Sequence, residues 1–275
     1  MRFGVILAGL AFLTAAAAAG ATETDAAAAE GVQPTIAIII DDMGANAIQG
    51  QRLIDLDQPL TLAFLPYRRY TTELATRAHQ QQKEVMLHAP MDNTRQIGLG
   101  AGGLTASMDQ LALTTTLRRS LRAVPHVQGV NNHMGSLLTQ LPEHMAWVME
   151  ELENYPLYFV DSRTIATTVA GQMAEEKKVP TLTRDVFLDH EQTREFVDQQ
   201  FKLLIRMARK NGTAIAIGHP HPVTVDYLEK ALPELDEQGI AVATVSAVWA
   251  IRNGNQRMFA EDEKQAILPA VARKK

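Results

Sequence analysis

Two adjacent carboxylates, Asp41 and Asp42, directly follow the apolar run Ile36–Ile40. An uninterrupted apolar run of this length is typical of a strand buried on both faces of a parallel sheet. Folds of this kind place their functional sites at the carboxyl ends of such strands. Adjacent carboxylates repel each other and a buried unpaired charge is costly, so the pair indicates a bound cation, a partner or a raised pKa. The plainer alternative, in which one aspartate caps a helix and the other faces water, explains the two acids together less well.

Histidines occupy the equivalent position after three other apolar segments. His88 and His133 come at the ends of the third and fourth segments, and His219 and His221 follow the seventh. If these segments are strands of one barrel, their carboxyl ends meet at a single mouth. Imidazoles and carboxylates gathered there form a ligand set for zinc or a similar divalent ion. Each histidine alone could be a hydrogen-bonded core residue, but three in equivalent places favour a shared site.

Polar residues also follow the fifth and sixth apolar segments. Asp161 and Arg163 come after the fifth, and Asp185 and Asp189 lie around the end of the sixth. Arg163 has two interpretations, as an ion-pair partner of Asp161 or Asp185 within the scaffold or as a group in the site. Asp189 likewise either caps the helix that follows it or supports the site. Asp161 or Asp185 could also orient a ligand histidine through its second ring nitrogen.

Apolar segments alternate with helical stretches throughout residues 34–250, without a break in composition. Strands are predicted at residues 35–40, 60–65, 84–87, 127–130, 157–160, 181–188 and 213–217, with a further candidate at 240–248. Helices are predicted at residues 44–56, 71–83, 107–123, 141–154, 167–178, 191–210 and 223–238. This alternation predicts a single α/β domain, a (β/α) barrel of seven strands, or eight if the last segment joins the sheet. A glycine-rich loop at residues 91–106 is expected to shape the site.

The two ends of the chain do not continue this pattern. One basic residue, an apolar alanine-rich stretch and an Ala-Gly-Ala sequence at residues 19–21 are typical of a secretory signal peptide at residues 1–21. We therefore expect an exported, periplasmic protein with no membrane span after signal cleavage, with an uncleaved anchor as the alternative. Residues 22–33 are expected to be a flexible lead-in and residues 251–275 a polar tail.

The composition excludes several classes of partner. The 275-residue chain contains no cysteine, so it has no disulfide, and its formal net charge is −5. Its lysines and arginines are scattered, without the basic stripe of a nucleic-acid-binding surface or the cationic amphipathic helix of a membrane-surface protein. Aromatic residues make up only 5% of the chain, which counts against a long saccharide cleft lined by aromatic platforms.

Six motifs, in this order along the chain, resemble those of the divergent polysaccharide deacetylases, exported bacterial relatives of the chitin and peptidoglycan deacetylases. They are Ile-Asp-Asp-Met-Gly (40–44), Leu-His-Ala-Pro-Met (87–91), Asn-His-Met-Gly-Ser (132–136), Phe-Val-Asp-Ser-Arg-Thr (159–164), Arg-Asp-Val-Phe-Leu-Asp (184–189) and Ile-Gly-His-Pro (217–220). The resemblance covers residues 34–250 and implies a distorted (β/α) barrel, usually of seven strands.

The resemblance also implies roles for individual residues. Asp41 matches the general base, Asp42 a metal ligand and His219 the general acid. The better-known deacetylases carry two ligand histidines four residues apart, and here the first matches His88 whereas the second position holds Asp92. Either Asp92 still ligates the metal or His133 takes its place. The arginine-rich third motif of those enzymes is not evident in its usual form.

The expected function is therefore that of an exported, metal-dependent hydrolase that removes acetyl groups from an N-acetylated polysaccharide or cell-wall glycan, with zinc as the expected ion. Catalysis would fall to Asp41 and His219, and binding of the ion to Asp42, His88 and His133. The supporting residues would be Asp92, Asp161, Arg163, Asp185, Asp189 and His221. The altered second motif and the scarce aromatics motivate an alternative, a non-catalytic glycan-binding or partner-binding protein of the same ancestry. A phosphoesterase is disfavoured because the chain is net negative and shows no basic phosphate cradle.

Overall fold

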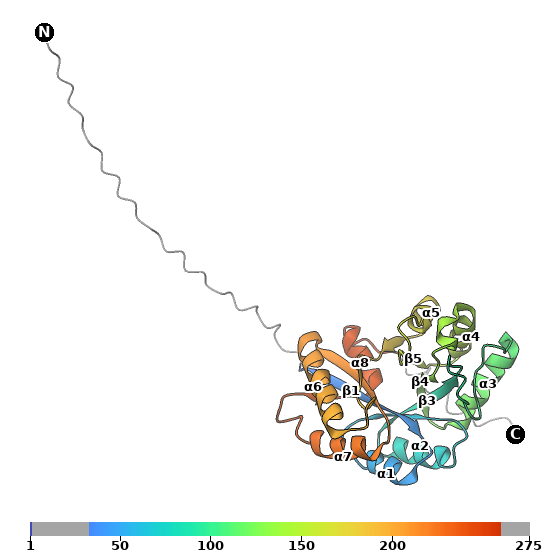
Figure 1. Cartoon of the computed structure of the whole chain (residues 1–275), viewed down its shortest axis with the longest axis horizontal. Coiled ribbons are helices and arrows are strands. Elements are labelled where there is room, and N and C mark those ends of the chain that lie inside the picture. Colours follow the sequence, from blue (N-terminus) through green and yellow to red (C-terminus); the bar gives the residue numbers. More distant parts are fainter. Residues whose placement is uncertain (2–32, 260–275) are drawn as a thin grey trace. The chain divides into compact units, whose positions relative to one another are not determined.

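Nine parallel strands organise the described part of the chain (Figure 1). The computed structural model describes Met1 and residues 33–259, and the residues from Gln33 onward belong to one compact unit. The strands are β1 (Thr35–Met43), β2 (Thr61–Phe64), β3 (Glu84–Met91), β4 (Val127–Met134), β5 (Tyr158–Asp161), β6 (Thr181–Thr183), β7 (Val186–Phe187), β8 (Thr213–Gly218) and β9 (Ala241–Val242). Their hydrogen-bonded order is β6-β5-β4-β3-β2-β1-β8-β7, with β9 pairing β1. Apart from Met1 and Gln33, the expected signal peptide and lead-in lie outside the described residues.

The two strands that end this order, β6 and β7, follow each other in the chain and are joined by Arg184 and Asp185. The backbone N–H of Arg184 donates to the carbonyl of Asp161 in β5 at 3.1 Å, whereas that of Asp185 donates to Ile215 in β8 at 2.9 Å. The chain thus crosses from one edge of the curved sheet to the other. The sequence predicted one strand at 181–188, and the structure has two short ones because their backbones pair with different neighbours. The predicted distorted barrel is confirmed. We call the crossing at Arg184 and Asp185 the seam, because the two edges of the sheet meet there.

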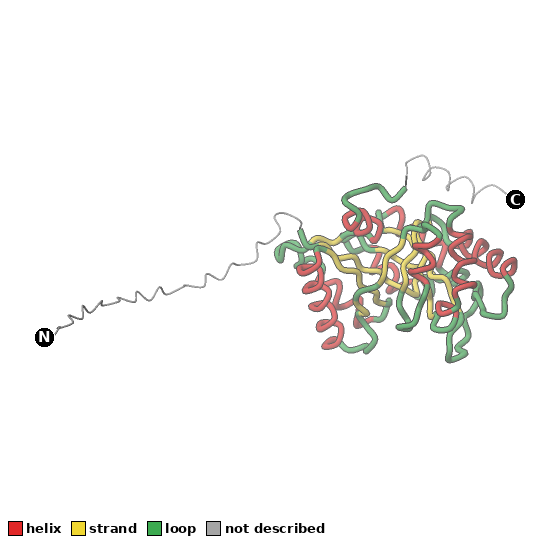
Figure 2. The backbone as a smooth tube through the Cα atoms, turned by 90° about the horizontal axis from the view of Figure 1, so that it is seen from above, coloured by secondary structure: helices red, strands yellow, loops and turns green. Residues whose placement is uncertain are grey.

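Helices flank the strands on both sides in the view of Figure 2. They are α1 (Ala47–Ile54), α2 (Thr71–Gln80), α3 (Gln110–Ala123), α4 (Pro142–Leu152), α5 (Ala170–Glu176), α6 (Arg194–Asn211), α7 (Pro222–Ala231) and α8 (Val245–Arg252), with a 3₁₀ turn at Leu138–Gln140. Side chains cap several of them, as Asp109 does for α3 by accepting from the Ala112 N–H at 2.8 Å. That cap starts α3 three residues later than the sequence predicted. None of the described helices has the length and apolar character needed to span a bilayer.

The predicted strand at 240–248 is the clearest error of the sequence analysis. Only Ala241–Val242 pair with β1, and Thr244 then caps α8. Val245 and Val248, three positions apart, face the same apolar cluster and are fully buried. The Val245 N–H donates to Thr61 Oγ1 at 3.1 Å, at the start of β2. Helix α8 therefore covers the amino ends of the strands and runs past residue 250 to Arg252, and residues 260–275 of the expected polar tail lie outside the described residues.

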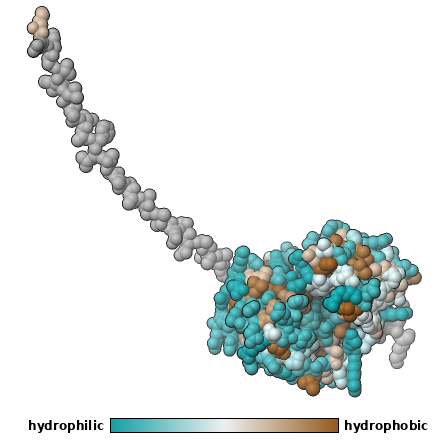
Figure 3. All heavy atoms as spheres, viewed as in Figure 1, coloured by the Kyte–Doolittle hydropathy of each residue, from teal (hydrophilic) through white to brown (hydrophobic). Residues whose placement is uncertain are grey.

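Buried apolar residues form two layers. One lies between the strands and the surrounding helices and includes Ile36, Ile38 and Ile40 of β1. The other fills the barrel interior and includes the alternate residues Ala37 and Ile39. Most residues on the face of this unit shown in Figure 3 are hydrophilic, and hydrophobic ones form small groups. The interior layer reaches the carboxyl ends of the strands, where the polar residues begin.

Candidate metal centre and proton-transfer dyad

Three of the predicted site residues continue the interior face of the barrel. Side chains alternate across a strand, so a residue two positions beyond an interior residue also points inward. Asp41, His88 and His219 each stand two positions after a residue of the interior cluster; those residues are Ile39, Met86 and Ile217. The hydrophobic pattern that buries the strands thus also aims the carboxylate and imidazoles at one another.

The backbone of Asp42 explains how two adjacent carboxylates approach the same place. In a regular strand, neighbouring side chains point to opposite faces. Asp42 has φ of 55°, in the left-handed region that aspartate tolerates better than most residues. This conformation interrupts the alternation. As a result, Asp41 Oδ1 lies 3.6 Å from His88 Nδ1, and Asp42 Oδ1 lies 3.4 Å from the Nε2 of the same ring.

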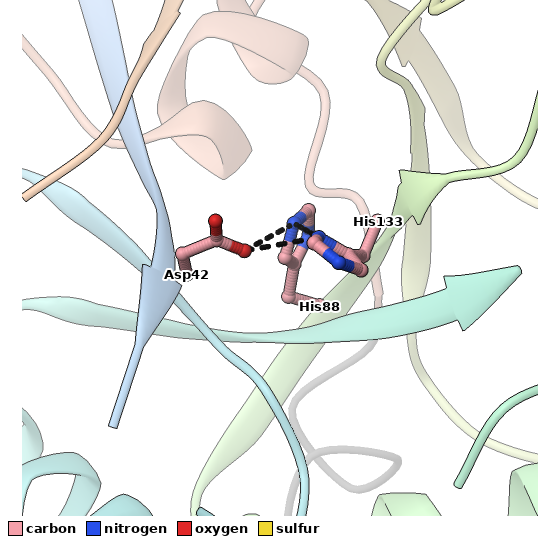
Figure 4. A group of neighbouring side chains, drawn as sticks. All are labelled: Asp42, His88 and His133. Carbon is pink, nitrogen blue, oxygen red and sulfur yellow. Dashed lines mark hydrogen bonds and ion pairs between the residues drawn. The ribbon is translucent and has the colours of Figure 1, made fainter. Parts of the chain in front are cut away.

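Asp42, His88 and His133 form the first cluster of possible ligands (Figure 4). One donor atom from each lies within 4.8 Å of the others. His133 Nδ1 is 2.9 Å from Asp42 Oδ1 and 3.0 Å from His88 Nε2. Two imidazole nitrogens this close repel unless a proton or a cation lies between them. Asp42 Oδ1 is buried and accepts no hydrogen bond within the described residues. One carboxylate and two imidazoles are a ligand set of catalytic zinc sites, so this donor set fits a divalent ion.

Asn131 connects the acid pair to this cluster. Its Nδ2 donates to Asp41 Oδ1 at 2.7 Å, and its Oδ1 lies 2.7 Å from His88 Nδ1. Because a carboxylate can only accept, the amide orientation is fixed and Oδ1 must accept from the Nδ1–H of His88. The lone pair of His88 is then on Nε2, the nitrogen that faces Asp42 and His133. Asn131 is fully buried, and its two hydrogen bonds fix the position of the Asp41 carboxylate and the tautomer of His88.

Asp189, His219 and His221 form a second cluster of similar size. Here the carboxylate is already fully hydrogen-bonded. Asp189 Oδ1 accepts from His219 Nδ1 at 2.9 Å, and its Oδ2 accepts from the His219 N–H at 2.6 Å and from Thr224 Oγ1 at 2.8 Å. This arrangement orients the His219 ring and leaves Nε2 as the nitrogen available for proton transfer. The His221 ring packs against that of His219, with centroids 5.5 Å apart.

The charges in the site shift several pKa values. Burial raises the pKa of Asp41 above its ordinary value, although His88, His219 and Asn131 work against it. Burial would likewise raise the pKa of Asp42, but His133 and His88 outweigh it and hold the pKa well below the usual range. Burial alone would lower the pKa of His88, and the carboxylates of Asp41 and Asp42 reverse this and raise it. A divalent ion competes with protons for these same ligand atoms, so its binding releases protons.

His219 carries the clearest shift. Burial works to lower the pKa of its imidazole, but the hydrogen bond that the ring donates to Asp189 and the charge of Asp41 outweigh burial and raise the pKa to about 9. The ring is therefore protonated at neutral pH, with Nε2 carrying a proton that it can donate.

A pocket of about 330 Å³ joins the two clusters. Asp41, His88, His133 and His219 all line it. The carboxylate of Asp41, the two imidazoles of the first cluster and the imidazole of His219 therefore surround one space. Its other lining residues are Asn132, Met134, Ser162, Arg163, Thr164, Arg184, Phe187, His190 and Ile217.

Several predicted supporting residues hold the scaffold instead. Asp92 accepts from the N–H groups of Asn93 and Ala106 in the glycine-rich loop and does not join the first cluster, where His133 stands in its place. Asp161 accepts from the Arg163 N–H and Thr168, and Asp185 from the Ile215 N–H and Arg252. Neither carboxylate orients a histidine; Asn131 and Asp189 do so. The side chain of Arg163 pairs with neither of these acids in the described structure.

Asn131, Ser162, Arg184 and Phe187 were not singled out from the sequence, although Asn131 bonds to the site and the others line its pocket. Each lies in or beside a strand-end motif, which was the available signal. An asparagine at a strand end has no chemistry that distinguishes it from a turn residue, and only the distances to Asp41 and His88 reveal its role.

Known proteins share the sequence pattern and the fold of this chain. Residues 38–249 match the family described as divergent polysaccharide deacetylase. The chain is 34% identical over 217 residues to an uncharacterized protein of Haemophilus influenzae, covering 79% of this chain and 77% of that one. It is 38% identical over 200 residues to the protein YibQ of Escherichia coli, covering 73% of this chain and 63% of YibQ.

A crystal structure of an uncharacterized protein from Agrobacterium tumefaciens has the same fold, with a TM-score of 0.76 and 24% identity over 80% of this chain and 90% of that one. The family match at residues 38–249 contains every strand end described above. The chain belongs to the divergent polysaccharide deacetylase family.

Proposed function

We propose that this protein is a divalent-metal-dependent deacetylase that hydrolyses the acetyl amide of an N-acetylated polysaccharide or cell-wall glycan. One observation carries the proposal. Asp42, His88 and His133 form a donor set, and its two imidazoles line one pocket with the buried carboxylate of Asp41 and the oriented imidazole of His219. Amide hydrolysis needs these three functions, which are electrophilic activation, a base and an acid.

Asp42, His88 and His133 would hold the ion. When bound, a divalent ion supplies Lewis-acid polarisation of the amide carbonyl and lowers the pKa of water from about 15.7 to about 7. Two imidazoles and one carboxylate favour zinc over harder ions such as magnesium or calcium, which prefer oxygen ligands. Asn131 accepts from Nδ1–H of His88, which leaves Nε2 as the nitrogen that would bind the ion.

Asp41 would act as the general base. Asn131 occupies its Oδ1, which leaves Oδ2 to accept a proton from the attacking water. Burial raises the pKa of this carboxyl, which makes its conjugate base a stronger proton acceptor than an exposed aspartate. The amide of Asn131 holds the carboxylate in place during the transfer.

His219 would act as the general acid. Its ring is protonated at neutral pH, and Asp189 fixes the Nδ1 side, so the proton on Nε2 goes to the leaving amine. The carboxylate of Asp189 then stabilises the imidazolium before transfer and orients the neutral ring after it.

Metal removal tests this function. Acetate release would be measured from N-acetylglucosamine oligomers and peptidoglycan fragments before and after chelation. We expect activity to vanish on chelation and to return when zinc is added. Asp41→Asn should retain the metal and lose turnover, which separates the base from the ligands, and Asp236→Ala on the exposed surface is the matched control. Activity that survives complete metal removal would contradict the proposal. Metal-loaded protein that binds one of these sugars without releasing acetate would instead support the non-catalytic glycan-binding alternative.

Export to the periplasm is part of the same proposal, supported by the signal-peptide pattern at residues 1–21. Fractionation of cells that produce the full chain should find a shortened protein in the periplasmic fraction. Full-length protein retained in the cytoplasm or the membrane would contradict export with cleavage.

A further inference from the structure

Two arginines and a buried hydroxyl line the same pocket, on the side formed by the end of β5 and the barrel seam. They are Ser162, Arg163 and Arg184. Ser162 is only 5% exposed, and its Oγ has no hydrogen-bond partner among the described residues. The pocket lining thus combines an unpaired buried hydroxyl with two arginines that make no ion pair within the described residues, and a buried hydroxyl normally has a partner.

Arg184 is held in place without being neutralised. Its Nε donates to the Ser162 carbonyl at 2.7 Å, its Nη2 donates to the Arg163 carbonyl at 3.0 Å, and the group lies 5.1 Å from the centre of the Phe187 ring. Both acceptors are neutral, and within the described residues the side chain makes no ion pair. Burial and then Arg163 lower the pKa of this guanidinium, but its ordinary value is so high that it stays charged.

Arg163 is positioned by its backbone. It has φ of 47°, and its N–H donates to Asp161 Oδ1 at 2.9 Å. On either side of it, the Ser162 N–H donates to Asn132 Oδ1 at 2.9 Å and Thr164 Oγ1 donates to the Met134 carbonyl at 2.8 Å. The side chain is exposed and makes no hydrogen bond or ion pair within the described residues. The loop is thus fixed while its guanidinium remains available to a ligand.

We propose that Ser162, Arg163 and Arg184 bind a carboxylate of the substrate, so that the preferred glycan is acidic and carries this group close to its N-acetyl amide. The proposal rests on the deacetylase function and specifies its substrate class. Guanidinium groups recognise carboxylates through paired, charge-assisted hydrogen bonds. Asp41 lines the same pocket and would repel a more highly charged anion, which favours a carboxylate over a phosphate. Neutral chitin-type oligomers would offer no charge-balancing acceptor to the two arginines and would bind less well.

Binding measurements on the metal-loaded Asp41→Asn protein test this directly, because that variant should not consume the ligand. The probes are N-acetylmuramic acid, with a carboxylate on the ether at C3, and N-acetylglucosaminuronic acid, with one at C6. Each is compared with its own methyl ester by calorimetry. We expect at least one acid to bind about tenfold or more tightly than its ester, the gain of one charge-assisted contact. Which acid shows the preference identifies the source of the carboxylate.

Variants then assign the preference to the arginines. Arg163→Gln should reduce the ratio of acid to ester affinity to nearly one. Arg184→Lys should reduce it in part, because a lysine keeps the charge but loses the planar fork. Arg206→Gln, on the exposed surface of α6, makes the same charge change away from the pocket and should leave the ratio unchanged. The exposed Arg163 side chain makes no hydrogen bond or ion pair within the described residues, so its replacement should not impair folding; thermal unfolding checks both variants. Equal affinity for acid and ester, or a preference that survives Arg163→Gln, overturns the proposal.

Acetate release by the wild-type protein separates this proposal from the deacetylase function. Equal rates and equal affinities for neutral and acidic N-acetylated sugars would overturn the carboxylate site and leave the deacetylase intact. Arginine-dependent binding of the acid with no acetate released by metal-loaded protein would establish the anion site and remove the deacetylase function.

Discussion

The two clusters at the mouth of the barrel contain the same kinds of group, one carboxylate and two imidazoles, and yet they suit different positive charges. In the first, Asp42 Oδ1 accepts no hydrogen bond and faces the nitrogens of His88 and His133. In the second, both oxygens of Asp189 already accept from N–H or O–H donors. The first cluster therefore fits a metal cation, and the second fits a proton. Residue types alone do not distinguish these cases; the hydrogen bonds of the carboxylate do.

The largest expected effect comes from removing the carboxylate of the first cluster. Asp42→Ala should lose bound metal and reduce acetate release to the level of the metal-free protein, because two imidazoles alone hold the ion weakly. Asp189→Ala should keep the metal at full stoichiometry. Metal content after dialysis, measured by mass spectrometry, shows which of the two variants still binds the ion. Loss of metal in both variants would mean that the two clusters share an ion, and the comparison would fail.

Removing the proton donor of the second cluster should come next. His219→Ala should keep its metal and lower kcat by roughly 10²–10⁴-fold, the usual contribution of a general acid. In the wild type, kcat should fall as pH rises through about 9, because the proton on His219 is lost there. Asp189→Asn should move that fall to lower pH, since Asp189 raises the pKa. A pH–rate profile measures both, and an unchanged alkaline limb in Asp189→Asn would contradict the assignment.

The same shift affects stability. The pKa of His219 in the folded protein, about 9, lies above the ordinary 6.5 expected on unfolding. Its contribution to the free energy of unfolding is therefore fully present below about pH 6.5 and is lost as pH rises through about 9. The contribution is of the order of 3 kcal/mol. Denaturant titrations of wild type and His219→Gln at pH 6 and pH 10 should differ more at the lower pH; equal differences would contradict the ion pair.

A smaller effect is expected at Asn131, which serves the first cluster without belonging to it. Asn131→Leu removes the bond that sets the tautomer of His88 and should weaken metal affinity by about 10–100-fold, as loss of a ligand's hydrogen-bond partner usually does. The exposed Asn154→Ala is the control. Competition with a chelator measures the metal affinity of both variants and of the wild type. Wild-type affinity in Asn131→Leu would mean that the amide only fills space.

The smallest effect should come from the support of the second cluster. Thr224→Val removes one hydrogen bond to Asp189 from a fully buried hydroxyl and should lower the free energy of unfolding by about 1 kcal/mol. Metal binding should not change. Urea unfolding measures the change in the free energy of unfolding, and metal titration measures metal binding. A change in metal affinity would show that the two clusters are coupled more closely than their separate hydrogen bonds suggest.

Most of the fold and the centre of the site could be predicted from the sequence because they depend on local pattern. Apolar runs mark strands, and the residue types that follow Ile40, Leu87 and Ile217 mark the mouth. The choice between Asp92 and His133 could not be predicted, since it depends on where the glycine-rich loop turns. The roles of Asn131 and of the crossing at Arg184 depend on distances between segments far apart in the chain. Helix α8 was missed because Val245 and Val248 lie in a run that is apolar enough to be either helix or strand.

The seam at Arg184 and Asp185 gives the pocket a dynamic property. β6 and β7 do not pair with each other there, and Arg184 and Asp185 each contribute one backbone hydrogen bond, at the ends of the ladders to β5 and β8. Local opening of a protein is easiest where few bonds must break together. Arg184, which spans this connection, also lines the pocket. A ligand bound by Arg184 would therefore disfavour local opening between the two edges of the sheet. Amide hydrogen exchange at residues 184 and 185 should slow when the ligand is bound.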